Sequence, residues 1–178
     1  HTRWATHGEP NNINAHPQFS NSKKLCLVHN GIIENYSTIK QKLIKEGFSF
    51  TSQTDTEVLV NLMEFVKNKN DVKLGEAVQI ALNQVVGAYA IAVIDDDKPD
   101  EIVVAKLGSP LCIGIGEDEH FIGSDVTPFI EYTKDVVYLE DGELAIIRNH
   151  KETFFRKIDD DSTISPTVSK LELSLDKI

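Results

Sequence analysis

The sequence is short of cysteine, of positive charge and of long apolar runs, and each shortage excludes a class of protein. Its 178 residues include only 2 cysteines, Cys26 and Cys112, which cannot form a disulfide framework. With 18 basic against 28 acidic residues, the net charge of −10 argues against nucleic acid or an anionic membrane surface as a partner. The longest apolar runs, such as AYAIAVI at 88–94, are far too short to cross a bilayer.

The rest of the composition is that of one ordinary globular domain. Hydrophobic residues make up 40% of the chain and charged residues 26%, and 178 residues are enough to bury a core. No signal-peptide pattern stands at the start of the sequence. We therefore expect a cytoplasmic protein.

Three amphipathic segments predict helices in the first half of the chain, at 35–47, 54–68 and 74–87. Ser37 is expected to cap the first of these helices. Thr54 and Glu57 fit a capping box at the start of the second, in which each side chain binds the backbone of the other residue.

From Ala88 onward, short apolar runs alternate with acidic or Gly/Pro turns. Connections this short cannot make parallel crossovers, so we expect antiparallel strands. Residues 136–148 predict a hairpin, because Asp141-Gly142 supplies the positive φ of a tight two-residue turn. Helices followed by antiparallel strands indicate an α+β fold, with a domain over 1–160 and a linker over 161–178.

The first nineteen residues, HTRWATHGEPNNINAHPQF, are rich in groups that bind ligands or react. The Arg3 guanidinium, beside Thr6 and His7, suits two-pronged recognition of a carboxylate. The alternative is a solvated surface arginine, with Trp4 filling a gap near a chain end. Composition alone leaves both interpretations open.

At two further positions, a functional interpretation competes with a structural one. Asn30 and Gly31 follow an apolar strand, where their N–H donors would suit an oxyanion hole, but an ordinary Asn-Gly turn has the same pattern. Asp55 suits a ligand's ammonium group, yet a carboxylate in the first turn of a helix also complements the helix dipole.

The histidines and cysteines predict neither a metal site nor a cofactor. No short ligand motif fits the spacing of the first four histidines, His1, His7, His16 and His29. Both cysteines lie within apolar runs, where a free cysteine behaves as a small buried hydrophobic residue.

Several motifs, taken together, carry a family resemblance. In order, HTRWATHG, NAHPQF, VHNGIIENY, TDTEV, GAYAI and GSPLCIGIG resemble the glutaminase domain of the glutamine–fructose-6-phosphate aminotransferase family, whose members are class II glutamine amidotransferases. The match runs from His1 to about Arg148, and HTRWATHGEP is its most specific part. The resemblance implies an N-terminal-nucleophile hydrolase fold, an αββα sandwich of antiparallel sheets that is incomplete here at the N-terminus.

The resemblance also gives roles to residues around a glutamine substrate. Arg3 would grip the α-carboxylate of L-glutamine, with Thr6 and His7 beside it in a closing loop. Asp55 would hold the α-ammonium group, and Trp4 would help to gate the passage of ammonia. A sugar-isomerase domain after residue 178, in a homo-oligomer, would pass the ammonia to fructose 6-phosphate and make glucosamine 6-phosphate.

One departure from the family pattern concerns catalysis. Asn30 and Gly31 match the oxyanion hole, but the family's nucleophile is an N-terminal cysteine and this chain begins with His1. We therefore expect a fragment that starts inside its domain and does not hydrolyse glutamine alone. The alternative is a module without a nucleophile that senses glutamine or packs against a phosphosugar enzyme.

Overall fold

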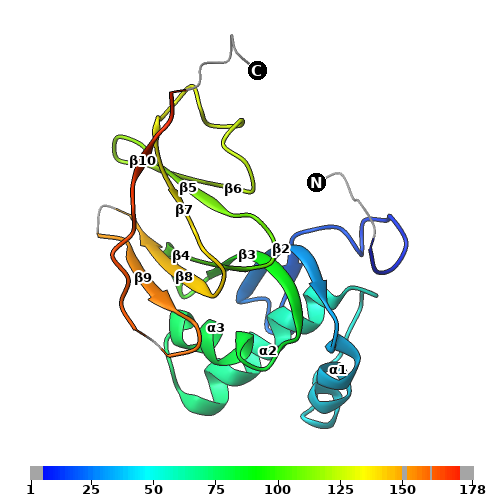
Figure 1. The fold of residues 1–178 in the computed structure, drawn as a ribbon. Coiled ribbons are helices and arrows are strands. Elements are labelled where there is room, and N and C mark those ends of the chain that lie inside the picture. The colour runs from blue at the N-terminus through cyan, green and yellow to red at the C-terminus, as the bar shows by residue number, and fades with distance from the viewer. Residues whose placement is uncertain (1–5, 150–151, 161, 173–178) are drawn as a thin grey trace.

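A layer of helices and two antiparallel sheets make up the molecule (Figure 1). The computed structural model describes residues 6–149, 152–160 and 162–172. Among these residues, every pairing between named strands is antiparallel. Together with the separate helical layer, this pairing confirms the α+β class.

The larger sheet has six strands in the order β1-β2-β3-β4-β8-β9 and the smaller sheet has four in the order β10-β7-β5-β6. The helices are α1 (Tyr36–Lys45), α2 (Asp55–Asn70) and α3 (Leu74–Leu82). The strands of the larger sheet are β1 (Gln18–Phe19), β2 (Leu25–Ile33), β3 (Gly87–Asp95), β4 (Lys98–Leu107), β8 (Glu143–Arg148) and β9 (Phe154–Lys157). Those of the smaller sheet are β5 (Cys112–Ile115), β6 (His120–Gly123), β7 (Asp135–Tyr138) and β10 (Ser169–Lys170).

The helices cover one face of the larger sheet and form the main core with it. Helix α2 packs on β1 and β2, α3 packs on β4, and α1 packs against α2. Leu27 and Val93 from the strands meet Leu43, Val60 and Met63 from the helices, and all five are buried. Apolar residues at helical spacing thus face the sheet, and the three predicted helices are confirmed. The first and third are shorter than predicted, and the second extends two residues further, to Asn70.

The cap predicted for α1 is wrong. Asn35, rather than Ser37, stands at the N-cap, and no side chain caps the helix there. The Asn35 amide instead donates to the Gln84 carbonyl and accepts from the Val86 amide, each at 2.9 Å. The helix start is therefore fixed by a contact with the segment before β3, which local sequence does not reveal.

The smaller sheet packs on the other face of the larger one through a second core. Ala90 and Val104 of the larger sheet meet Ile113 and Val137 of the smaller sheet there. Figure 1 shows the smaller sheet lying over the β4 and β8 side of the larger sheet. No helix within the described residues is long and apolar enough to span a membrane.

The hairpin predicted over 136–148 is wrong. Strand β7 pairs with β5 and β10, whereas β8 pairs with β4 and β9. Gly142 does have a positive φ of 80°, but its turn carries the chain from one sheet to the other. An apolar strand pairs equally well with several partners, so the turn signal predicted a local pairing that the tertiary fold replaced.

Residues 162–172, which were predicted as linker, remain beside the sheets. Arg156 forms an isolated bridge with Thr163, and β10 adds an edge strand to the smaller sheet beside β7. The domain boundary at 160 and the linker over 161–178 stay predictions.

Part of the larger sheet lies outside the cover of the smaller one. On the face away from the helices, four apolar side chains of β1, β2 and β3 are 41–49% exposed: Phe19, Val28, Ile32 and Ile94. We call these four residues the open-face patch. Their register places them on the same side, since Phe19 pairs with Cys26 and Cys26 pairs with Ile94.

Candidate functional site

The candidate site is built around the first turn of α2. Thr54 lies in extended conformation before the helix, and its hydroxyl accepts from the Glu57 amide at 3.1 Å. The Glu57 carboxylate does not return to Thr54 but accepts from the backbone amides of Thr51 and Ser52, at 2.9 and 2.7 Å. The capping box is therefore half correct, and the buried Glu57 instead fixes the loop that leads into the helix.

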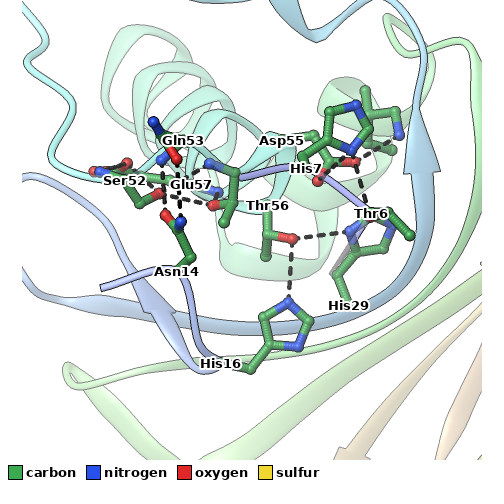
Figure 2. Close-up of polar contacts among 12 residues, drawn as sticks. Thr6, His7, Asn14, His16, His29, Ser52, Gln53, Asp55, Thr56 and Glu57 are labelled. Carbon is green, nitrogen blue, oxygen red and sulfur yellow. Dashed lines mark hydrogen bonds and ion pairs between the residues drawn. The ribbon is translucent and has the colours of Figure 1, made fainter. Parts of the chain in front are cut away.

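Asp55, the first residue of α2, is buried and joins three segments. One carboxylate oxygen accepts from the Ile33 amide of β2 at 2.8 Å, and the other lies 3.8 Å from Nδ1 of His7. The Thr6 hydroxyl lies 3.4 Å from the same Nδ1, and the His7 ring meets Tyr36 edge-on. Thr6, His7 and Asp55 thus come together, as Figure 2 shows.

The loop that carries Thr6 and His7 is held by Asn14. Its side chain donates to the Glu9 carbonyl at 3.0 Å and accepts from the Gln53 amide at 2.9 Å, which ties the loop to the start of α2. Gly8 lies between these contacts with a φ of 76°, and a β-carbon there would lie 2.6 Å from the Asn14 amide nitrogen. Arg3 and Trp4, predicted for the same loop, lie outside the described residues.

Asn30 and Gly31 lie within a strand, so the turn interpretation is wrong. Strand β2 continues through both residues to Ile33. Gly31 has a φ of 126°, and a β-carbon there would lie 2.2 Å from the Ala88 carbonyl oxygen of β3. The requirement for glycine at position 31 therefore comes from the close approach of two strands.

The side chains of Asn30 and Asp55 lie on opposite sides of β2. Residues alternate along a strand, so the exposed Asn30 faces away from the helices while its buried neighbour His29 faces them. Asn30 lines a hollow of about 160 Å³ between the larger sheet and β6. The structure therefore gathers three of the predicted site residues on the helix side and leaves Asn30 on the other.

A second set of polar residues next to Asp55 was not predicted. The Thr56 hydroxyl lies 3.1 Å from Nδ1 of His29 and 3.2 Å from Nε2 of His16 (Figure 2). The pKa of His29 is lowered, because burial outweighs the opposing effects of Asp55 and the Ala88 carbonyl. Strand alternation, which places His29 on the buried side with Leu25 and Leu27, was the available signal.

Neither cysteine has the surroundings of a nucleophile. Cys112 is buried in the smaller sheet, as predicted, and burial and then Asp125 raise the pKa of its thiol to about 11. Cys26 is half-buried on β2, and burial raises the pKa of its thiol as well. Both thiols are therefore protonated near neutral pH. Within the described part of the chain, no three His, Cys, Asp or Glu side chains gather as a metal site would require.

Comparison with known proteins places this sequence and its fold in a known class of domain. The chain belongs to the glutamine amidotransferase domain family, whose pattern matches residues 1–131. Its similar relatives include the glutamine–fructose-6-phosphate aminotransferases of Bacteroides thetaiotaomicron, 57% identical over 100% of this chain, and Chlorobaculum tepidum, 49% identical over 100%. The resemblance inferred from the motifs is confirmed. The chain spans 29% of the length of each of these relatives.

Solved structures give the same result for the fold. The glutamine phosphoribosylpyrophosphate amidotransferase of B. subtilis has a TM-score of 0.73 and 28% identity, over 90% of this chain and 34% of its own. A structure described as the allosteric regulatory enzyme of purine biosynthesis has a TM-score of 0.68 and 29% identity, over 83% of this chain and 32% of its own. The chain has the N-terminal-nucleophile hydrolase fold of these enzymes, which confirms the predicted fold.

Proposed function

We propose that this chain is the glutamine-binding part of the glutaminase domain of a glutamine–fructose-6-phosphate aminotransferase. The whole enzyme would hydrolyse the side-chain amide of L-glutamine to glutamate. The ammonia released would pass to fructose 6-phosphate in a sugar-isomerase domain, giving glucosamine 6-phosphate. The observation that carries the proposal is the buried Asp55 carboxylate, set at the start of a helix beside His7 and Thr6.

Each proposed residue role is matched to the charge of one group of glutamine or of the reaction intermediate. Asp55 would hold the α-ammonium of glutamine, because a buried carboxylate makes a strong charge-assisted bond to a cation. Arg3 would bind the α-carboxylate, with Thr6 and His7 beside it, and Trp4 would gate the ammonia. For the oxyanion, donors from Asn30 and Gly31 would stabilise the negative charge that develops during amide hydrolysis.

Hydrolysis by this chain alone is not expected. A cysteine attacks as its thiolate, and burial raises the pKa of both Cys26 and Cys112. We expect no glutamate release above background from the chain with L-glutamine. Release that disappears in Cys26→Ala would contradict this and would make Cys26 the nucleophile.

Calorimetric titration with L-glutamine and D-glutamine tests the ligand site. We expect L-glutamine to bind and D-glutamine not to bind, since Asp55 and Arg3 would each hold one α-substituent. Asp55→Asn should weaken binding by about 10- to 100-fold through loss of one charge-assisted bond. The asparagine side chain keeps an oxygen for the Ile33 amide, so the fold is retained.

Asp97→Asn is the matched control for that variant. Asp97 is exposed and pairs with Lys24 at 2.8 Å on the turn between β3 and β4. Its substitution should leave glutamine affinity unchanged. Equal effects of Asp55→Asn and Asp97→Asn, or equal binding of both enantiomers, would contradict the proposed site and favour a module that only contacts another protein.

We also propose a homo-oligomeric, cytoplasmic protein. Self-association is supported by the open-face patch, because contiguous exposed apolar groups favour a protein contact. In sedimentation velocity, Val28→Lys should lower the fraction of dimer, whereas Ile44→Lys on the exposed side of α1 should not. A compact monomer at high concentration, unchanged by either variant, would contradict the homo-oligomer.

A further inference from the structure

Two contacts from the first turn of α2 hold β2 on either side of Asn30 and Gly31. Asp55 accepts from the Ile33 amide at 2.8 Å, and Thr56 meets the His29 ring at 3.1 Å. Consecutive helix residues thus bind strand residues that bracket the proposed oxyanion donors. A shift of α2 relative to β2 would therefore break these contacts and displace Asp55 from the proposed donors.

The third member of the set extends the link to the loop of Thr6 and His7. Nε2 of His16 lies 3.2 Å from the same Thr56 hydroxyl. In Figure 2 the Thr56 hydroxyl points between the two imidazole rings, with Asp55 on the adjacent helix position. One hydroxyl therefore joins three segments, each of which supplies a proposed glutamine contact.

One hydroxyl can serve both rings. A threonine hydroxyl has one hydrogen to donate and two lone pairs that accept, so it can bond to the His29 and His16 nitrogens at the same time. The contact with Thr56 and the neighbouring Ala88 carbonyl hold the His29 ring on the helix side of β2.

We infer that His29, Thr56 and His16 form a positioning unit for the glutamine site, in which the shared Thr56 hydroxyl fixes Asn30, Gly31 and Asp55 relative to one another. None of the three is proposed to touch the reacting atoms. The inference rests on the proposed function for its ligand, but the geometry that it assigns is measurable without one.

Thr56→Val and Thr56→Ser separate the hydroxyl from the shape of the side chain. Valine keeps the volume and removes the hydrogen bonds, while serine keeps the hydroxyl. We expect Thr56→Val to weaken L-glutamine binding about 5- to 10-fold and Thr56→Ser to restore it to within about twofold. Thr38→Val, on the exposed side of α1, is the matched control and should change nothing.

Nuclear magnetic resonance tests the geometry without ligand. The Gly31 amide and Asn30 side-chain resonances should shift in Thr56→Val and return in Thr56→Ser. His16→Ala, at a half-buried position, should also shift the Gly31 amide resonance. This variant tests the same geometry if Thr56→Val does not fold.

The outcomes separate the two proposals. If the unmodified chain does not bind L-glutamine, the proposed function fails, while the resonance shifts still decide whether the unit positions Asn30 and Gly31. If it binds and Thr56→Val neither weakens binding nor shifts these resonances, the positioning unit is wrong.

Discussion

The two faces of β2 differ although they belong to the same nine-residue strand. On the helix side, Leu25, Leu27 and Ile33 are at most 1% exposed, and His29 lies among them with a polar partner. On the other side, Val28 and Ile32 are 43% and 41% exposed. The helix side is closed by α2, whereas the smaller sheet reaches only part of the opposite side.

The difference shows on which side of β2 the polar contacts of the site lie. In the positioning unit, His29 lies on the closed side of β2 and Thr56 on the helix that closes it, where a low dielectric strengthens hydrogen bonds. Asn30, on the other side, is exposed. Buried polar contacts therefore place the site, while the Asn30 side chain proposed for the oxyanion faces outward.

The largest expected effect contrasts neighbouring residues on the two faces. Leu27→Ala should lower the free energy of unfolding by about 2–5 kcal/mol, because it opens a cavity beneath α2. Val28→Ala should cost less than about 1 kcal/mol, since its side chain is largely exposed. Urea unfolding measures both. Equal losses would mean that the open face is covered in solution.

The next effect concerns the approach of β2 to β3. Gly31→Ala combines an unfavourable φ with a clash against the Ala88 carbonyl and should cost about 2–4 kcal/mol. Gly47→Ala, at a φ of 94° with no atom within 4 Å of the added carbon, isolates the backbone strain and should cost about 1–2 kcal/mol. Similar melting temperatures for the two variants would show that β2 moves away to accommodate the methyl group.

A smaller effect tests the helix starts that support the closed side. Thr54→Ala removes the side-chain cap of α2 and should cost about 1 kcal/mol. Ser37→Ala should stay within about 0.5 kcal/mol, because Ser37 is exposed and does not cap α1. Thermal unfolding compares the two variants. A larger loss of stability for Ser37→Ala would support Ser37 as the cap of α1, as expected from the sequence.

The smallest effect is a pH dependence from His29. Because burial holds its pKa below 6.5 in the folded chain, the unfolded chain binds more protons just below pH 6.5. Above pH 6.5, His29 does not lower the free energy of unfolding. As the pH is lowered toward the folded pKa, the free energy of unfolding falls by at most about 1.4 kcal/mol per pH unit. His29→Gln should flatten this part of the curve, and an unchanged slope would assign the dependence to other groups.

Much of the architecture could be predicted from local patterns. Periodic apolar residues located the three helices, and Thr54 marked the start of α2, because these signals depend on neighbouring residues. Pairing could not be predicted in the same way. Residues 136–148 look like a hairpin, yet β7 and β8 enter different sheets because their partners lie far away in the sequence.

The candidate site also has a part that local sequence predicts and a part that only packing decides. Its family motifs are contiguous, so Thr6, His7, Asn30, Gly31 and Asp55 could be named from the sequence. The sequence by itself determined the family, the helices and these side chains. Only the tertiary structure decided that β2 runs through Gly31, that Asn30 and Asp55 lie on opposite sides of it, and that one Thr56 hydroxyl joins His16 to His29. The physical reason is that hydrogen bonds between distant segments depend on packing, which local sequence patterns do not encode.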